Sequence, residues 1–193
     1  MAVFVFWLLT NVVIPQEDIR FTHTFKQGFD TSCGISATAT LLNKYWNIPI
    51  LESEMYQEMI IDKIDDDAGT YTISLATISD YLRGHNIQSR AYRMDWDELR
   101  DTLEKDFRPI IVHYQSPTIH FALLLHIEGD YAFVADPSRG FELIDRWTFT
   151  KHFSGNVMLT ASRVHQRNNE YIAQIISEKQ NRLNRLQRVA RLR

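Results

Sequence analysis

The most constraining feature of this sequence is a pair of apolar runs separated by one short turn. The runs are residues 120–125 (HFALLL) and 131–135 (YAFVA), with Glu-Gly-Asp at 128–130 between them. Short apolar runs on either side of a turn tripeptide predict two buried strands that pair antiparallel. The pairing brings Asp136, after the second strand, close to His120, which begins the first. Adjacent strands lie about 5 Å apart, so we expect the carboxylate to reach the imidazole.

A possible nucleophile lies far from this hairpin in the sequence. Cys33 is the only cysteine, so it cannot form an internal disulfide and has no cysteine partner for a zinc site. Good N-cap residues precede it and apolar residues at helical spacing follow it, namely Asp30, Thr31 and Ser32, then Ile35, Ala39, Leu42 and Tyr45. The sequence therefore predicts that Cys33 begins a helix. Unpaired backbone N–H groups and the helix dipole favour the thiolate there.

Two interpretations of Cys33 are open. A single cysteine in a globular domain is more often a buried, unreactive side chain than a nucleophile. Gly34 favours the nucleophile, because a glycine at a helix start lets a substrate approach the backbone closely. Gln27, six residues before Cys33, adds a side-chain N–H for a developing oxyanion. With His120 as base and Asp136 to orient it, these residues would form a cysteine hydrolase site.

Other polar groups fit structural roles. Four further histidines lie at a strand end, beside a strand, in a turn and in a loop: His126, His113, His85 and His23. No pair has the HExxH spacing of a zinc site, so we expect no metal and no cofactor. The three aspartates at 65–67 lack the spacing of an EF-hand and are interpreted as a solvated turn.

The set of candidate site residues resembles that of the bacteriocin-processing cysteine peptidases, which cleave double-glycine leaders. The likeness lies in the order Gln27, Cys33, His120, Asp136, in the Cys-Gly pair that begins a helix and in the Asp-Pro pair that ends a hairpin. The resemblance runs from about residue 21 to residue 160. It implies a papain-like fold in which Cys33 is the nucleophile and His120 is the base. It also implies that Asp136 orients the histidine and that Gln27 donates to the oxyanion.

The resemblance extends to residues 149–159, which are similar to the closing helix and strand of that family. One departure is Ser32, where many members carry aspartate directly before the cysteine. Asp30 is the candidate to take its place.

The resemblance also implies a context. Family members often form the N-terminal domain of an ABC exporter, but no membrane-spanning helices or nucleotide-binding motif follow here. We therefore expect a free-standing relative that cleaves a peptide or protein with a Gly-Gly leader, in a bacterial secretion system such as those that export functional amyloid subunits. The family includes degenerate members that bind export substrates without cutting them, so a non-catalytic binding module is the alternative. The presence of all four site residues favours activity.

The sequence predicts an α+β fold, with a helical half packed on an antiparallel sheet. Helices are expected at 33–46, 52–61, 74–83 and 95–106, the last with Asp95 and Glu98 as a capping box. Strands are expected at 87–92, 109–113, 120–127, 131–135, 141–144 and 156–160. The nucleophile would come from the helices and the His–Asp pair from the sheet, with a cleft between them.

Charge is distributed unevenly along the chain. The net charge is −3, which argues against nucleic acid as the main partner. Residues 162–193 carry eight Lys or Arg against two Glu, a charge of +6, so the remainder is −9. The apolar residues of the tail fall near a heptad seam that Lys179 interrupts: Ile172, Ile176, Leu183, Leu186 and Ala190. Such a basic amphipathic helix suits a membrane surface or a secretion partner, and could make the protein a membrane-associated scaffold, while a solvated extension is the alternative.

We therefore predict three parts, an apolar segment at 1–16, a peptidase domain at 17–162 and a basic helical tail at 163–193. The apolar run at 2–14 is too short for a membrane span and suits the core of a signal peptide, although it lacks a basic start and an A-x-A cleavage site. A buried N-terminal strand is the alternative. We expect an exported protein, periplasmic or membrane-associated in a bacterium, with a cytoplasmic location left open.

Overall fold

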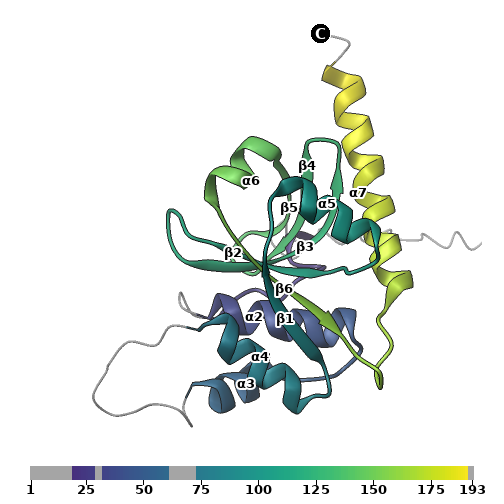
Figure 1. Ribbon diagram of the computed structural model, residues 1–193. Helices are drawn as coiled ribbons and strands as arrows, with labels where there is room; N and C mark the ends of the chain where they lie inside the picture. The colour runs from purple at the N-terminus through teal and green to yellow at the C-terminus, as the bar shows by residue number, and fades with distance from the viewer. Residues whose placement is uncertain (1–18, 29–31, 61–72, 191–193) are drawn as a thin grey trace, which may run out of the picture.

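The computed structural model describes residues 19–28, 32–60 and 73–190, which form a sheet with helices on both faces (Figure 1). The helices are α2 (Cys33–Thr40), the π-helical turn η1 (Leu41–Tyr45), α3 (Glu52–Met59), α4 (Leu75–Gly84), α5 (Trp96–Glu104), α6 (Arg146–His152) and α7 (Asn169–Ala190). The strands are β1 (Gln88–Arg93), β2 (Ile110–Tyr114), β3 (His120–Glu128), β4 (Tyr131–Asp136), β5 (Gly140–Asp145) and β6 (Phe153–Ala161).

The six described strands form one sheet in the order β1-β6-β2-β3-β4-β5. Every neighbouring pair is antiparallel. Strands β3, β4 and β5 follow one another directly, as the two apolar runs and the turn between them predict. The sheet therefore confirms the expected helices on an antiparallel sheet.

The sheet separates two apolar clusters. Along β3, Phe121, Leu123 and Leu125 face the cluster formed with α2, α3, α4 and α7. Their neighbours Ala122 and Leu124 face the second cluster, formed with α5 and α6. Because both faces of β3 are covered, its sequence is apolar at almost every position rather than at alternate ones.

Local signals place several helices as expected. At the start of α5, the Asp95 carboxylate accepts from the N–H of Asp97 and Glu98 at 2.9 Å, and the Glu98 side chain accepts from the Asp95 N–H at 2.8 Å. This capping box was predicted from the sequence. Helix α4 begins one residue after Ser74, whose hydroxyl accepts from the Thr77 N–H at 3.1 Å.

Helix α6 is absent from the helices expected by periodicity. It has seven residues, including Trp147, two threonines and Phe149, which are only moderate helix formers. Its N-cap, Asp145, accepts from the Thr148 N–H at 3.0 Å. That aspartate was the signal available in the sequence, besides the resemblance over 149–159.

Helix α7 corrects the expectation that the apolar seam of the tail lies outside the domain core. Ile172, Ile176 and Leu183, all on that seam, belong to the cluster under the sheet. Lys179 interrupts the seam without leaving the interface, because its ammonium lies 4.8 Å from the centre of the Phe141 ring and 3.2 Å from Glu178. The part of α7 from Ile172 to Leu183 therefore contributes to the core. The division of the chain at 162 stays a prediction.

Three expectations lie outside the described residues: the apolar segment at 1–16, the aspartates at 65–67, and the capping role of Asp30 and Thr31. Within the part that the structure describes, no helix combines the length and apolar character needed to cross a membrane.

Candidate active site

Cys33 is the first residue of α2, directly after Ser32, as the sequence predicts. Its side chain is buried against β3. From the sequence, Gly34 is expected to permit the close approach of a substrate. In the structure, the glycine is needed instead for close packing of the helix. A Cβ atom there would lie 2.6 Å from Ile73 Cγ2 and 3.2 Å from the Phe121 ring. The glycine thus lets α2 pack closely against Ile73, just before α4, and against Phe121 of β3.

The predicted His–Asp contact is present. The Nε2 atom of His120 lies 2.9 Å from Oδ2 of Asp136. The pairing of Leu123 with Ala135 continues the two strands so that Asp136 falls diagonally across from His120. The geometry expected from the hairpin is therefore confirmed. Since Nε2 faces the carboxylate, Nδ1 is the ring nitrogen left for the thiol.

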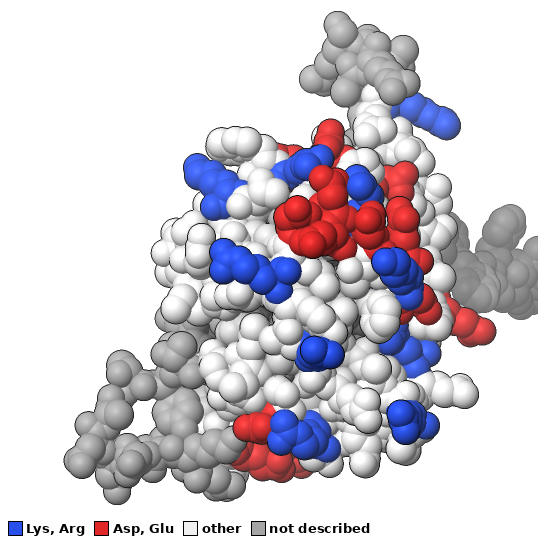
Figure 2. Space-filling model, viewed as in Figure 1, with Lys and Arg blue, Asp and Glu red and all other residues white. Residues whose placement is uncertain are grey.

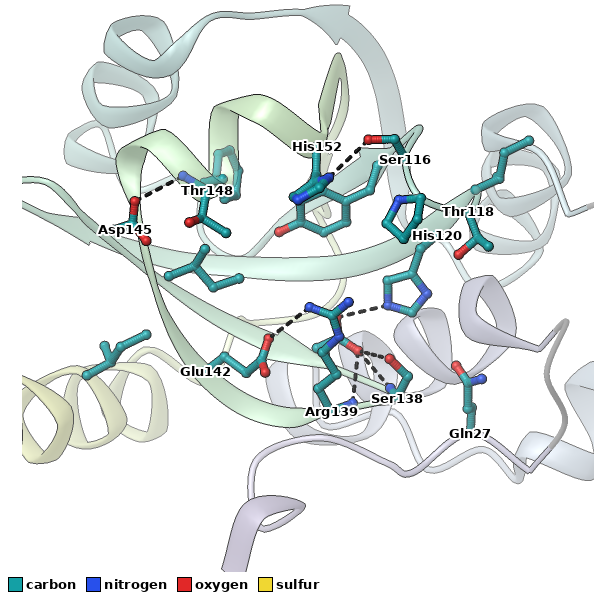
Figure 3. A pocket seen from close by; sticks show the side chains of 17 residues that line it. Gln27, Ser116, Thr118, His120, Ser138, Arg139, Glu142, Asp145, Thr148 and His152 are labelled. Atoms are coloured by element: carbon teal, nitrogen blue, oxygen red, sulfur yellow. Dashed lines mark hydrogen bonds and ion pairs between the residues drawn. The ribbon is translucent and has the colours of Figure 1, made fainter.

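The loop after β4 fixes the orientation of the Asp136 carboxylate. Its Oδ1 atom accepts from the Ser138 N–H and hydroxyl, both at 2.7 Å, and from the Arg139 N–H at 3.1 Å. The other oxygen is left for His120 (Figure 3). These bonds and His120 hold the pKa of Asp136 below its usual range, although its burial acts in the opposite direction.

Two opposing effects act on the Cys33 thiol. Burial alone would raise its pKa. The hydrogen bond and the charge of His120, together with the backbone N–H groups of Phe121 and Gly34, outweigh burial and lower the pKa of Cys33 below that of an ordinary thiol. The thiolate is therefore favoured, as its place at the start of a helix predicts.

The same contacts stabilise the protonated imidazole. Burial would lower the pKa of His120, but the hydrogen bonds and negative charges of Asp136 and Cys33 raise it to about 9. At neutral pH the arrangement therefore favours a thiolate–imidazolium pair backed by a carboxylate. Such a pair supplies a nucleophile and a proton donor together.

Gln27 lies on a segment that is fastened to the same loop. Its backbone N–H donates to the Pro137 carbonyl at 2.9 Å. Its side chain lines the cavity beside His120, where its buried Oε1 atom has no hydrogen-bond partner among the described residues (Figure 3). The structure therefore brings all four predicted residues, Gln27, Cys33, His120 and Asp136, to one region.

A cavity of about 540 Å³ extends from this region along the sheet. Gln27, His120 and Asp136 form one end of its wall. The rest of the wall comes from Tyr114 at the end of β2, from the loops between β2 and β3 and between β4 and β5, and from β5 and α6 (Figure 3).

The other histidines contact structural partners. His126 lies 3.1 Å from Glu128, His113 lies 2.8 Å from the Ser154 hydroxyl, His152 lies 3.0 Å from Ser116, and His23 lies 3.0 Å from the Tyr171 hydroxyl. Among the described residues, no group of three or more His, Cys, Asp or Glu could hold a metal ion.

Sequence reasoning missed three residues around the site. Ser138 fixes the Asp136 carboxylate, Tyr114 pairs with His120 across β2 and β3, and Glu142 lines the cavity from β5. Only Ser138 carried a signal, because an Asp-Pro-Ser sequence favours a turn in which the aspartate accepts from later backbone N–H groups.

Comparisons with known proteins identify relatives of this arrangement. The model of the peptidase C39 family matches residues 22–165. A protein of Pseudomonas aeruginosa named probable functional amyloid protease FapD is 26% identical over 150 residues, which cover 78% of this chain and 65% of that protein. A protein of Pseudomonas fluorescens with the same name is 26% identical over 139 residues, covering 72% of this chain and 60% of the relative. The match thus spans less than two thirds of either relative.

Two solved structures share the fold. The peptidase domain of Streptococcus ComA, a bifunctional ABC transporter of a quorum-sensing pathway, superposes with a TM-score of 0.60 at 15% identity, covering 73% of this chain and 98% of that one. A double-glycine motif protease from an AMS/PCAT transporter, solved with its leader peptide, gives a TM-score of 0.55 at 20% identity, covering 71% and 89%. The expected papain-like fold is confirmed by this likeness.

Proposed function

Because the chain belongs to the peptidase C39 family, we propose that it is a cysteine peptidase with Cys33, His120 and Asp136 as its catalytic residues. The observation that carries the proposal is the 2.9 Å contact between His120 and Asp136 beside a thiol whose pKa is lowered. The non-catalytic alternative would not need a charged thiol and imidazole held together in this way.

The reaction proceeds in two stages. The Cys33 thiolate attacks the scissile carbonyl carbon, and the oxyanion accepts from the Gln27 side-chain amide and the Cys33 N–H. The protonated His120 gives its proton to the leaving amine as the C–N bond breaks, which leaves a thioester. His120 then takes a proton from water, whose hydroxide attacks the thioester; the C–S bond breaks, giving the Cys33 thiolate and a carboxylic acid that loses its proton to solvent. Asp136 holds the imidazole throughout.

We propose further that the substrate has a Gly-Gly leader and belongs to an exported peptide or a secretion-system protein. Support comes from the likeness to a double-glycine motif protease solved with its leader peptide, and from relatives named functional amyloid proteases. Location outside the cytoplasm would suit such a substrate. A secretion partner or a membrane surface would meet the exposed arginines at the end of α7.

The test is cleavage of a synthetic peptide with Gly-Gly before the cut. We expect the wild-type protein to process it, and the same peptide with Gly→Val at either position to resist, because narrow pockets exclude larger side chains. Cys33→Ala should be inactive on both. Equal cleavage of the glycine and valine peptides would indicate a cysteine peptidase of broader specificity. Activity in Cys33→Ala would overturn the peptidase proposal itself.

A further inference from the structure

The cavity next to His120 lies on one side of the candidate catalytic residues. Gln27 and His120 line it, whereas Cys33 is not among its lining residues. From His120 the cavity extends between β5 and α6, as far as Thr148 and Phe149. Its volume of about 540 Å³ is in the range of sites that enclose a bound group.

The chemistry of the proposed reaction indicates which half of the substrate reaches this space. The acyl half stays bonded to Cys33, while the amine half receives its proton from His120. The bond that breaks must therefore lie between the thiol and the imidazole, with its oxygen directed at Gln27. A chain that continues past the leaving nitrogen meets the wall that His120 and Gln27 share, and beyond it the cavity.

Negative charges outnumber positive ones on the wall of the cavity. Three carboxylates line the cavity, those of Asp136, Glu142 and Asp145, against the guanidinium of Arg139 and the imidazolium of His120, which Asp136 contacts. Arg139 approaches Glu142 only to 3.8 Å, and its own side chain is 58% exposed, so it neutralises Glu142 weakly (Figure 3). The Glu142 carboxylate, 27% exposed, is thus partly removed from water. The positive charges of Arg139, Arg20 and His120 act on it but do not offset its burial and the charge of Asp136.

A buried hydroxyl that can accept a hydrogen bond lies on the same wall. Tyr114 is 7% exposed and lines the cavity, and its hydroxyl has no hydrogen-bond partner among the described residues. Burial, together with the nearby charges of Asp136 and Glu142, raises its pKa, so the group stays a neutral phenol. Burial and the charge of Asp136 also raise the pKa of Glu142, which a cation placed beside it would reverse.

We propose that this cavity binds one of the first two residues after the scissile bond and selects a basic side chain, lysine or arginine. The ammonium or guanidinium would lie against Glu142 and the Tyr114 hydroxyl, and the side-chain methylenes against Phe149. This inference rests on the proposed peptidase function. It concerns the residues that follow the cut, not the leader before it.

The test uses Gly-Gly peptides that differ only at the first or second position after the cut, with Lys, Gln, Leu or Glu there. For the wild-type protein we expect kcat/KM for the lysine peptide to exceed that for the glutamate peptide by about tenfold at one of the two positions. Glutamine should fall between them. No preference for lysine at either position would overturn the inference.

Two variants separate this charge effect from a loss of folding. Glu142→Gln should reduce the lysine preference to about twofold or less, because the acceptor loses its charge. Arg139→Gln, a change at an exposed side chain, should increase the preference because it removes the competing cation. A matched control, Glu104→Gln at an exposed position of α5, should leave the ratio unchanged. A weaker lysine preference in Arg139→Gln would contradict the inference even if Glu142→Gln did not fold.

The outcomes also distinguish the two proposals. If no peptide is cut, or if Cys33→Ala cuts as well as the wild type, the peptidase function fails. If cutting requires Gly-Gly and Cys33 but ignores the residues that follow, only the cavity assignment fails.

Discussion

The Cys33 thiol and the His120 imidazole each stabilise the charged form of the other. The pKa of Cys33 is lowered, and that of His120 is raised to about 9. The ion pair therefore forms as pH rises through the lowered pKa of the thiol, and it is lost as pH rises through about 9. Between these limits the thiolate attacks while the imidazolium still carries the proton for the leaving amine.

We expect iodoacetamide to label Cys33 rapidly near neutral pH, below the range in which an ordinary thiol, with a pKa of about 8.5, reacts. Peptidase activity should show an alkaline limb near pH 9, where His120 loses its proton. The measurements are labelling rates and kcat/KM from pH 4 to 10. In His120→Ala the labelling profile should move toward that of an ordinary thiol, and an unchanged profile would show that the histidine does not activate Cys33.

Single substitutions test the roles of the other site residues. His120→Ala should remove activity nearly as completely as Cys33→Ala, because the effects of substituting residues that act as a unit are not additive.

The two supporting residues should have smaller effects. Asp136→Asn should keep a residual rate, and Gln27→Ala should lower kcat by about a hundredfold, as for one lost oxyanion donor. The matched control is His126→Ala, on the same strand as His120. A larger loss in this control than in His120→Ala would overturn the assignment of the base.

Among the elements, α2 depends on a close approach to β3. A methyl group on Gly34 would meet Ile73 Cγ2 at 2.6 Å and Phe121 at 3.2 Å. Gly34→Ala should therefore push α2 away from Ile73, just before α4, and from Phe121 of β3, and destabilise the protein by about 1–3 kcal/mol. Thiol labelling should slow as well, since Cys33 would move with the helix. The control is Gly28→Ala, where the added methyl has no atom of a described residue within 4 Å, and equal losses in both would refute the steric explanation.

Helix α7 contributes core residues rather than a detachable tail. Ile172, Ile175, Ile176 and Leu183 are all buried. Ending the chain after Arg167 removes all four, at about 1.5–3 kcal/mol each, which is comparable to the whole stability of a domain. We expect that shortened protein to be unfolded by circular dichroism. Ending it after Arg185 should leave the melting temperature nearly unchanged, and a folded, active chain lacking all of α7 would contradict this account.

The elements also divide into those that the sequence predicts and those that it does not. The buried strands and the contact between His120 and Asp136 follow from two apolar runs and a turn, because strand pairing is local in sequence. Whether α7 is buried depends on which surface of the domain lies beneath it. An apolar seam that contains Lys179 is compatible with exposure to solvent and with packing on the core, so the sequence does not decide between them. The role of Gly34 likewise depends on Ile73 and Phe121, which lie 39 and 87 residues away in the sequence.

The candidate site shows the same division. Cys33, His120, Asp136 and Gln27 were found by residue type, order and a family resemblance. Glu142 and Tyr114 belong to no sequence motif. They reach the cavity only because of how the strands pair in the sheet. Residues that select a substrate are placed by tertiary structure more than by local pattern, so the sequence alone did not reveal them.

On the face of the molecule drawn in Figure 2, acidic side chains are gathered and basic ones are spread. Figure 2 shows acidic side chains concentrated over α5, where Asp97, Glu98, Asp101 and Glu104 are exposed. The lysines and arginines on that face lie apart from one another. A nucleic acid binds along a continuous basic surface, which this described face does not offer. The expectation that nucleic acid is not the main partner stays a prediction.

The two apolar clusters share the sheet, so neither half has a complete core alone. We therefore expect one cooperative unfolding transition. Trp46 lies in the cluster with α2 and Trp96 in the cluster with α5, so each reports on one side of the sheet. Denaturation followed by fluorescence of Trp46→Phe and of Trp96→Phe, each made together with Trp7→Phe and Trp147→Phe, should give in each variant the midpoint found by circular dichroism. Midpoints that separate would mean that the two sides unfold independently.

Helix α7 lies beyond residues 22–165, the part that matches the family, yet it touches the segment that carries Gln27. Tyr171 contacts His23 at 3.0 Å, four residues before Gln27. A ribosome adds about 5–20 residues per second, so about 1–4 s pass between synthesis of Ala161, the end of the sheet, and of Leu183. During that interval the nascent chain already contains every candidate catalytic residue but lacks the helix that completes its core. We therefore expect the growing chain to reach its full stability only after Leu183 has been made.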